Sequence, residues 1–312
     1  MSTVTTAPAL EAERLGKRYG RRVWALRDCT LQLPQGRVTA LVGPNGAGKT
    51  TLLQLAIGLM APTGGTVRVF GEHARANTPQ ALARVGFVAQ DHPLYKGFTV
   101  ADLLTMGQRL NLPGRFDRPL AERRLAQLDI PLDRRAGRLS NGQQAQVALA
   151  MALAKRPRLL LLDEPVASLD PLARREFMQV LMGATAEDGL TVLLSSHVVA
   201  ELERVCDHLV VLVAGRVRVA GDVEELLASH RLLVGPRADQ QALRQVPGVL
   251  SVRHGDRQTS LLVRTSPDRP ATHPNWQAHP VNLEDLVLAY LQLPQPSLPQ
   301  PSHDPASMEV TA

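Results

Sequence analysis

Residues 43–50 read GPNGAGKT, and this stretch decides the fold of the chain. It fits the phosphate-binding pattern G-x-x-x-x-G-K-[ST], in which glycines let successive backbone N–H groups point at phosphate oxygens. Lys49 would reach the β- and γ-phosphates of a nucleotide, and Thr50 would ligate Mg²⁺. The stretch follows an apolar run, RVTALV, and opens a helical one, TTLLQLAIGLM, as a phosphate cradle must. A glycine-rich turn with an incidental lysine would not need a buried strand before it and a helix after it. The stretch therefore predicts a nucleotide-binding site.

Four short aliphatic runs predict the sheet that carries this loop. They lack the alternation of half-exposed strands, which favours strands buried on both faces of a mostly parallel α/β sheet. Other stretches alternate as antiparallel strands do, and residues 208–221 read as a hairpin turning at Ala214 and Gly215. The aliphatic runs are VTALVG (38–43), VGFVAQ (85–90), LLLLDEP (159–165) and TVLLSSH (191–197), and the alternating ones are residues 26–36 and 65–71.

The run LLLLDEP places Asp163 and Glu164 at the end of a buried strand. There Asp163 would orient Mg²⁺ through water, and Glu164 would polarise the water that attacks the γ-phosphate. Two adjacent carboxylates could instead cap the following helix, but the upstream phosphate loop favours the catalytic interpretation.

Residues 139–146, LSNGQQAQ, precede a helical run and mark a helix N-terminus. Ser140 could simply cap its own helix, with Gly142 easing the turn. Alternatively, the unpaired N–H groups and the partial positive charge of the helix end could bind an anion. These residues by themselves leave both possibilities open.

Composition limits the class of protein. The chain has 312 residues, is 44% hydrophobic and carries a net charge of +6, so its surface favours polyanions. Aromatic residues make up only 3% of it, which counts against stacking of single-stranded nucleic acid, and no nucleic-acid partner is expected. Only four of its 35 basic residues are lysines, so a lysine at a particular site points to a need for its compact charge.

The two cysteines of the chain read as buried thiols in a reducing compartment. The N-terminus lacks the pattern of a secretory signal, and no run is long enough to span a bilayer.

Five motifs in order resemble the ATP-binding cassette of ABC transporters over roughly residues 9–225. They are GPNGAGKTT, Gln90 in VGFVAQ, LSNGQ, LLLLDEPVASLD and His197 in LLSSH. The resemblance implies a P-loop α/β fold with a mostly parallel core sheet, an antiparallel β-subdomain and a helical subdomain at about 91–155. It also implies an ATPase that uses ATP and Mg²⁺.

The resemblance assigns roles position by position. Tyr19 matches the aromatic residue that stacks on adenine, and Gln90 the glutamine that senses Mg²⁺ and the membrane partner. Asp170 matches the loop between two active sites, and His197 the switch histidine at the γ-phosphate. Two cassettes of this family pack head to tail, so Ser140 and Gly142 would bind the γ-phosphate of a neighbouring copy. The residues expected to bind the nucleotide are Tyr19, Gly43, Pro44, Asn45, Gly46, Ala47, Gly48, Lys49, Thr50, Thr51, Ser140, Asn141, Gly142 and Gln143. Those expected to hold Mg²⁺ are Thr50, Gln90 and Asp163. Those expected to take part in catalysis are Glu164, His197, Gln90 and Asp170.

The sequence departs from the family pattern in two places. Asn141 stands where the family usually has the first glycine of LSGGQ, and its side chain could crowd the ATP interface. Gln146 replaces the usual arginine a few residues further on.

The remaining residues point to a transporter subunit. Residues 226–291 resemble the small α+β extension of bacterial exporter ATPases, and residues 292–312 have the composition of a disordered Pro-rich tail. The helical insertion would dock a separate permease, with Tyr95 and Phe98 as possible contacts or core residues, and would hold the chain at the cytoplasmic face of the membrane. A soluble ABC ATPase acting on ribosomes or DNA is the alternative, although such proteins carry two cassettes or a long coiled coil. An unrelated P-loop kinase or GTPase would not explain LSNGQ and His197.

Overall fold

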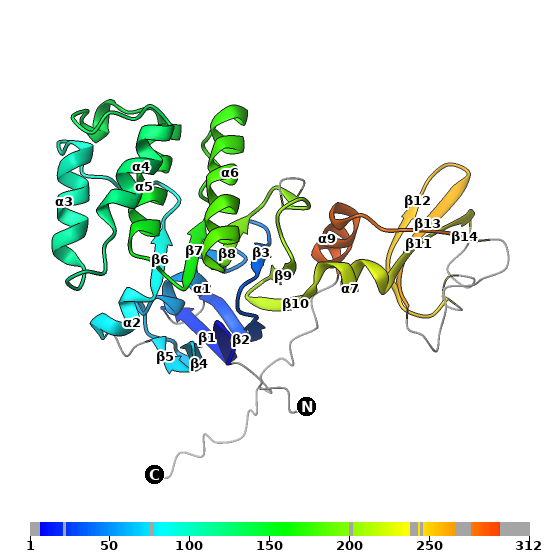
Figure 1. Ribbon diagram of the computed structural model, residues 1–312. Coiled ribbons are helices and arrows are strands. Elements are labelled where there is room, and N and C mark those ends of the chain that lie inside the picture. Colours follow the sequence, from blue (N-terminus) through cyan, green and yellow to red (C-terminus); the bar gives the residue numbers. More distant parts are fainter. Residues whose placement is uncertain are drawn as a thin grey trace, which may run out of the picture.

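The central sheet of the molecule has six strands in the order β10-β9-β3-β8-β7-β6 (Figure 1). The computed structural model describes residues 7–20, 23–74, 78–199, 202–237, 243, 246–265 and 276–293. All neighbours in this sheet run parallel except β9 and β10. The strands are β3 (Val38–Val42), β6 (Val85–Val88), β7 (Leu159–Asp163), β8 (Thr191–Ser196), β9 (His208–Val213) and β10 (Arg216–Asp222). The mostly parallel sheet predicted from the aliphatic runs is therefore confirmed.

The aliphatic runs are explained by burial on both faces of this sheet. Along β7, Leu159 and Leu161 pack into one hydrophobic cluster, whereas Leu160 and Leu162 pack into another. No position of such a strand faces water, so alternation with polar residues is absent. The predicted hairpin is also present, because β9 turns into β10 through Ala214 and Gly215, which both have positive φ, 49° and 75°.

A second, antiparallel sheet with the order β2-β1-β4-β5 covers one face of the central sheet, with helix α1 between them. Residues of β1, β2, β4 and α1 share the hydrophobic cluster that contains Leu159 and Leu161. The elements are β1 (Leu10–Tyr19), β2 (Val23–Leu33), β4 (Gly64–Val69), β5 (Glu72–His73) and α1 (Lys49–Ala56).

The predicted helical insertion lies between β6 and β7 and forms the upper left part of Figure 1. Helix α5 packs against α4, α6 and β6, and so joins the insertion to the central sheet. The helices of the insertion are α3 (Val100–Leu110), α4 (Arg118–Gln127), η2 (Ala136–Arg138) and α5 (Asn141–Ala154), whereas α2 (Pro79–Ala83) precedes β6 and α6 (Pro171–Asp188) follows β7.

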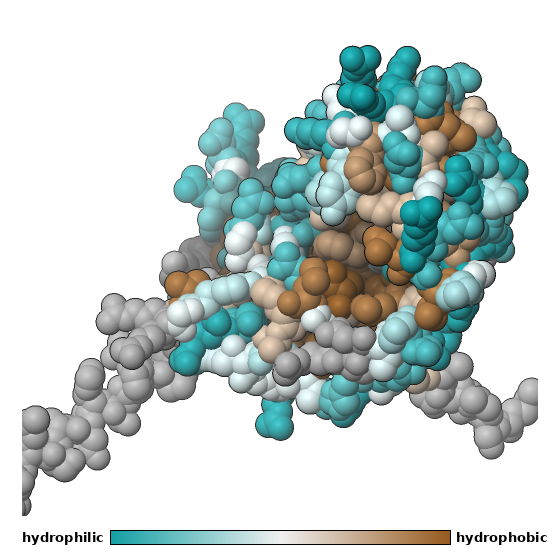
Figure 2. All heavy atoms as spheres, turned by 90° about the vertical axis from the view of Figure 1, so that its left-hand side faces the viewer, coloured by the Kyte–Doolittle hydropathy of each residue, from teal (hydrophilic) through white to brown (hydrophobic). Residues whose placement is uncertain are grey.

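An apolar groove of about 470 Å³ opens beside this insertion, and Figure 2 shows it as a brown hollow bordered by teal side chains. Its walls come from the residues after α1, from β6 and the segment that follows it, from α3 and from the C-terminal half of α5. The lining residues are Ile57, Leu59, Leu82, Val85, Phe87, Val88, Ala89, His92, Pro93, Leu94, Met106, Gly107, Leu110, Asn111, Phe116, Ala148, Met151, Ala152 and Lys155.

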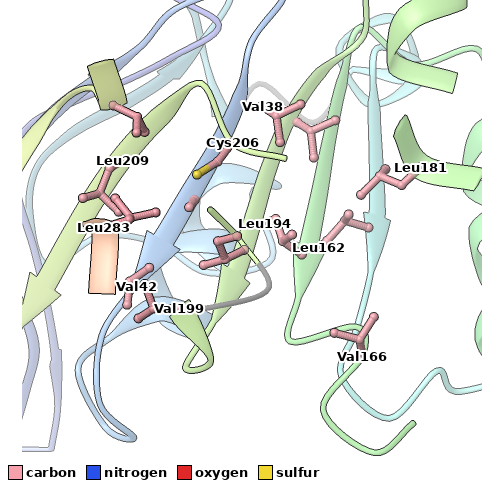
Figure 3. Packing of buried hydrophobic residues seen from close by; sticks show 14 of the residues in the cluster. Val38, Val42, Leu162, Val166, Leu181, Leu194, Val199, Cys206, Leu209 and Leu283 are labelled. Atoms are coloured by element: carbon pink, nitrogen blue, oxygen red, sulfur yellow. The ribbon is translucent and has the colours of Figure 1, made fainter. Parts of the chain in front are cut away.

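The residues after β10 form a small α+β unit that shares the hydrophobic core of the cassette. Its four strands have the order β12-β13-β11-β14. Leu283 of α9 packs beside Leu209 and Cys206 of the cassette (Figure 3), and both cysteines of the chain are free and buried. The elements are α7 (Val223–Ala228), β11 (His230–Pro236), β12 (Val249–His254), β13 (Gln258–Arg264), β14 (Gln277–His279) and α9 (Leu283–Gln292).

The sequence also predicts where the last helix gives way to the tail and that no segment spans a membrane. Helix α9 ends at Gln292, where the Pro-rich tail was predicted to begin, and residues 294–312 of that tail lie outside the described residues. Among the helices of the described residues, none is both long enough and apolar enough to span a bilayer.

Candidate nucleotide site

The GPNGAGKT loop joins β3 to α1, as its sequence context predicts. Two of its glycines are required by close packing. A Cβ at Gly43 would lie 2.2 Å from the Leu212 carbonyl oxygen, and one at Gly48 would lie 2.4 Å from that of Ala25. Gly48 also has φ of 106°, a left-handed conformation that favours glycine. The loop is therefore packed closely against β9 and β2.

The loop opens into a cleft of about 530 Å³ whose lining includes half of the predicted nucleotide residues. Segments far apart in the sequence meet here, because β3, β7 and β8 are neighbours and end at the same edge of the sheet. The lining residues are Ala25, Asn45, Gly46, Ala47, Gly48, Lys49, Thr50, Thr51, Gln90, Glu164, Ala167 and His197.

Lys49, Glu164 and His197 form a continuous chain of polar contacts in the cleft. Lys49 Nζ lies 3.0 Å from Glu164 Oε1, and both side chains are at least nine-tenths buried. The other oxygen of this carboxylate, Oε2, lies 2.9 Å from His197 Nδ1. Lys49 Nζ also donates to the Gly43 carbonyl oxygen at 2.7 Å. A basic group for phosphate, a carboxylate for water and a histidine therefore lie side by side.

The environment of Glu164 keeps its carboxylate ionised. Desolvation by burial acts to raise the pKa of Glu164, but the hydrogen bonds and charges of Lys49 and His197 outweigh it, and the pKa is lowered. An ionised carboxylate can accept a proton from water. The Glu164 backbone has φ of 42°, a conformation that costs energy in a non-glycine residue and that clusters at active sites.

Ser195 positions both carboxylates and was not recognised in the sequence. Its Oγ accepts the Glu164 backbone N–H at 2.8 Å and donates to Asp163 Oδ1 at 2.9 Å. Ser195 is completely buried on β8, one strand from β7. The sequence signal for Ser195 was its place two residues before His197. Its hydrogen-bond partners depend on the pairing of β7 with β8, which the sequence does not show.

Tyr19, Asp163 and Asp170 are not among the residues that line the cleft. The Tyr19 hydroxyl lies 3.5 Å from Thr51 Oγ1, and the ring is 44% exposed. Asp163 lies behind Glu164, held by Ser195. Asp170 caps helix α6, where its side chain accepts two backbone N–H groups.

The LSNGQ residues lie apart from this cleft, at the N-terminus of α5. Ser140 and Gln143 form a capping box, and Ser140 and Asn141 are exposed. A Cβ at Gly142 would lie 2.7 Å from Ala173 Cβ, so this glycine lets α5 approach α6. Asn141 begins the helix and has no positive φ. Gln146 is 5% exposed, and both its amide atoms lack a partner among the described residues.

The oxygen donors of the cleft suit a small hard cation. Thr50 offers a hydroxyl and Gln90 an amide oxygen within the same lining, and the Asp163 carboxylate lies behind Glu164. The part of the chain described here holds no cluster of three or more His, Cys, Asp or Glu side chains that would form a metal cage. Mg²⁺ is usually held by a few protein oxygens together with substrate phosphates, and this donor set fits that arrangement.

Known proteins are similar to this chain in sequence and in fold. The sequence pattern of the ABC transporter family matches residues 26–167. The Nod factor export ATP-binding protein I of Ralstonia nicotianae is 33% identical over 305 residues, which cover 91% of this chain and 94% of that protein. A sulfate/thiosulfate import ATP-binding protein of Rhizobium meliloti is 37% identical over 225 residues, or 70% of this chain and 64% of that protein.

The solved structures include an ATP-binding cassette captured as a dimer in a post-hydrolysis state with ADP and Pi. It is 25% identical, has a TM-score of 0.61, and the match covers 69% of this chain and 98% of that one. The phosphate loop, the carboxylate at the strand end and the shared fold lead to one conclusion. This chain is an ATPase and belongs to the family of ABC transporter ATP-binding subunits.

Proposed function

We propose that this chain is the ATP-hydrolysing subunit of an exporter, in which two copies close head to tail around two ATP molecules and drive a separate permease. The observation that carries the proposal is the chain of contacts from Lys49 through Glu164 to His197 in the phosphate-loop cleft. In this proposal residues 9–225 form the cassette, and residues 226–291 form an accessory unit packed on it.

Each group of the cleft has a task in hydrolysis. Lys49 neutralises the β- and γ-phosphates, and Glu164 accepts the proton of the attacking water. When phosphate oxygens engage Lys49, Glu164 loses an ion-pair partner and becomes a stronger base. His197 holds the second carboxylate oxygen and faces the γ-phosphate. Tyr19 stacks on adenine beside Thr51.

Mg²⁺ belongs to the same proposal. Thr50, Gln90 and, through water, Asp163 would hold it against the phosphates. When bound, the ion neutralises charge that develops on the β- and γ-phosphate oxygens.

The tip of α5 binds the ATP of the second copy. Its N-terminal N–H groups and dipole suit a γ-phosphate. Among the described residues the Ser140 hydroxyl bonds only to the Gln143 N–H, which it accepts at 3.2 Å, so its own proton is available to the ligand. Asn141 and Gly142 lie beside it, and Asp170 meets the interface from α6. The dimeric cassette described above supports this arrangement.

The permease binds at the apolar groove of Figure 2. Ala89 lines the groove and the adjacent Gln90 lines the nucleotide cleft, so a partner seated in the groove contacts the segment that reaches the ATP. The exposed Tyr95 and Phe98 rings, whose centroids lie 5.3 Å apart, continue this surface. Docking there holds the chain at the cytoplasmic face of the membrane.

One match that extends beyond the cassette supports export. The match to the Nod factor export protein covers 91% of this chain, which includes part of the unit that follows the cassette. The match to the sulfate importer covers only 70%.

The ATP-bound dimer tests the proposal. Glu164→Gln should slow hydrolysis by about 10² to 10⁴-fold while ATP still binds. Size-exclusion chromatography should then show a dimer with ATP and a monomer with ADP, and adding Ser140→Arg should remove the dimer because the side chain fills the phosphate position. A dimer that forms equally well with Ser140→Arg would refute the role of the α5 tip.

The direction of transport needs a separate measurement. Cells that carry Lys49→Ala should accumulate the transported compound inside and lose it from the medium, as comparative metabolite analysis would show. Depletion inside the cells would instead indicate import.

A further inference from the structure

Among the described residues that line the apolar groove, Lys155 is the only charged side chain, and none of them is acidic. It directly follows the last residue of α5, the helix whose other end carries Ser140. The lysine is half-buried, and in the described part of the chain no carboxylate lies within ion-pair distance of it. A cation in an apolar groove thus has no partner of opposite charge.

The ammonium group of Lys155 has hydrogen-bonding capacity to spare. Nζ donates to the carbonyl oxygens of Val85 at 2.8 Å and Leu82 at 3.2 Å. A lysine has three N–H donors, so one remains after these two bonds. Burial already lowers the pKa of Lys155, which shows that its charge is poorly solvated before any partner arrives.

Exposed leucines share the lining of the groove with this lysine. Leu59, Leu82 and Leu110 line the groove and are 69%, 43% and 77% exposed. A segment that buries these leucines also removes water from Lys155. Covering a charge without a counter-charge is costly, whereas a carboxylate opposite it restores the balance.

We infer that the permease segment seated in this groove is apolar but carries one aspartate or glutamate, and that its carboxylate pairs with Lys155. This inference rests on the proposed function, because it identifies a chemical property of the permease named there. Lys155 then selects the permease by its charge, in addition to joining the end of α5 to β6 through its hydrogen bond to Val85.

The test uses the full chain and the permease that copurifies with it. Lys155→Gln keeps N–H donors for the two carbonyl groups but removes the charge, and it should weaken the affinity for the permease by about tenfold or more. Lys155→Glu should weaken it further, and Lys155→Arg should keep most of it. Arg123→Glu, the same charge change at an exposed position of α4 outside the groove, is the matched control. ATP hydrolysis by the isolated variants should stay within about twofold of the unchanged chain.

A charge swap identifies the partner residue. Each acidic residue in the cytoplasmic loops of the permease is changed to lysine, and one such change should restore binding to Lys155→Glu. If Lys155→Glu binds the permease as well as the unchanged chain does, or if no swap restores binding, the inference is wrong. Loss of binding in Leu110→Asp but not in Lys155→Glu would overturn the inference and leave the proposed docking groove intact. Failure of every groove variant to affect binding, or of any permease to copurify, would overturn both.

Discussion

At the scale of single residues, the catalytic cleft depends on a serine that makes no predicted contact with nucleotide. Ser195 links the Glu164 backbone to the Asp163 carboxylate and is completely buried. Glu164 in turn holds a strained φ, so its position relies on such contacts. The distance from Lys49 to Glu164 is therefore set partly by a residue on a different strand.

Replacing Ser195 tests this dependence. Ser195→Ala leaves a buried N–H and a buried carboxylate oxygen without that partner, which should cost about 1–3 kcal/mol of unfolding free energy. A misplaced Glu164 should also lower kcat by about tenfold, equivalent to about 1.4 kcal/mol, with the affinity for ATP unchanged. Steady-state kinetics and ATP titration separate the two effects.

The neighbouring serine provides the control. Ser196 bonds only to the backbone of Val198 in this region, so Ser196→Ala should retain kcat. Equal kcat values for Ser195→Ala and the unchanged chain would show that Ser195 serves stability alone.

At the scale of elements, α9 ties the C-terminal unit to the cassette. Leu283, Leu286 and Val287 are completely buried in the same cluster as strands β7 to β9. His230 adds a polar anchor: its Nδ1 lies 2.6 Å from the Leu226 carbonyl oxygen, and its Nε2 lies 3.0 Å from the Tyr290 hydroxyl. Burial lowers the pKa of His230 and so favours the neutral ring, in which Nδ1–H donates to the carbonyl group and Nε2 accepts the tyrosine O–H.

Truncating a core residue of α9 should therefore destabilise the cassette itself. Leu286→Ala should lower the free energy of unfolding by about 2–5 kcal/mol through lost burial and a cavity. Gln292→Ala, an exposed position on the same helix, should change it by less than about 0.5 kcal/mol. Urea denaturation followed by circular dichroism measures both, and an unchanged cassette transition in Leu286→Ala would show that the two units unfold separately.

At the scale of the whole molecule, buried histidines couple stability to pH. Burial lowers the pKa of His92, of His208 and of His230 below the usual 6.5. Between the folded value and 6.5, the unfolded chain binds more protons than the folded one. Folding free energy is therefore lost as pH falls through this window.

The expected slope is steep enough to measure. Each histidine contributes up to about 1.4 kcal/mol per pH unit. Urea denaturation at pH 7.5, 6.5 and 5.5 should show falling stability, and His230→Gln should flatten the dependence. Stability that is constant or rises toward pH 5.5 would contradict this account.

The local features of this protein could be predicted from its sequence. The phosphate loop, the buried parallel strands, the Ala214–Gly215 hairpin and the LSNGQ helix start each depend on neighbouring residues, through backbone geometry and side-chain alternation. Lys49 and Glu164 were predicted from the phosphate-loop pattern and from the carboxylates at a strand end, and His197 from the family resemblance; the structure places all three in one cleft.

Only the tertiary structure showed which partners these residues have. Ser195 is separated from Glu164 by 31 positions, and Lys155 from the leucines at the groove rim by 45 to 96, so no local pattern connects them. The Ser195 contacts arise when β7 pairs with β8, and the groove arises when α3, α5 and β6 converge. Local sequence determines the type of each element, whereas burial and hydrogen bonding between distant elements decide which side chains meet.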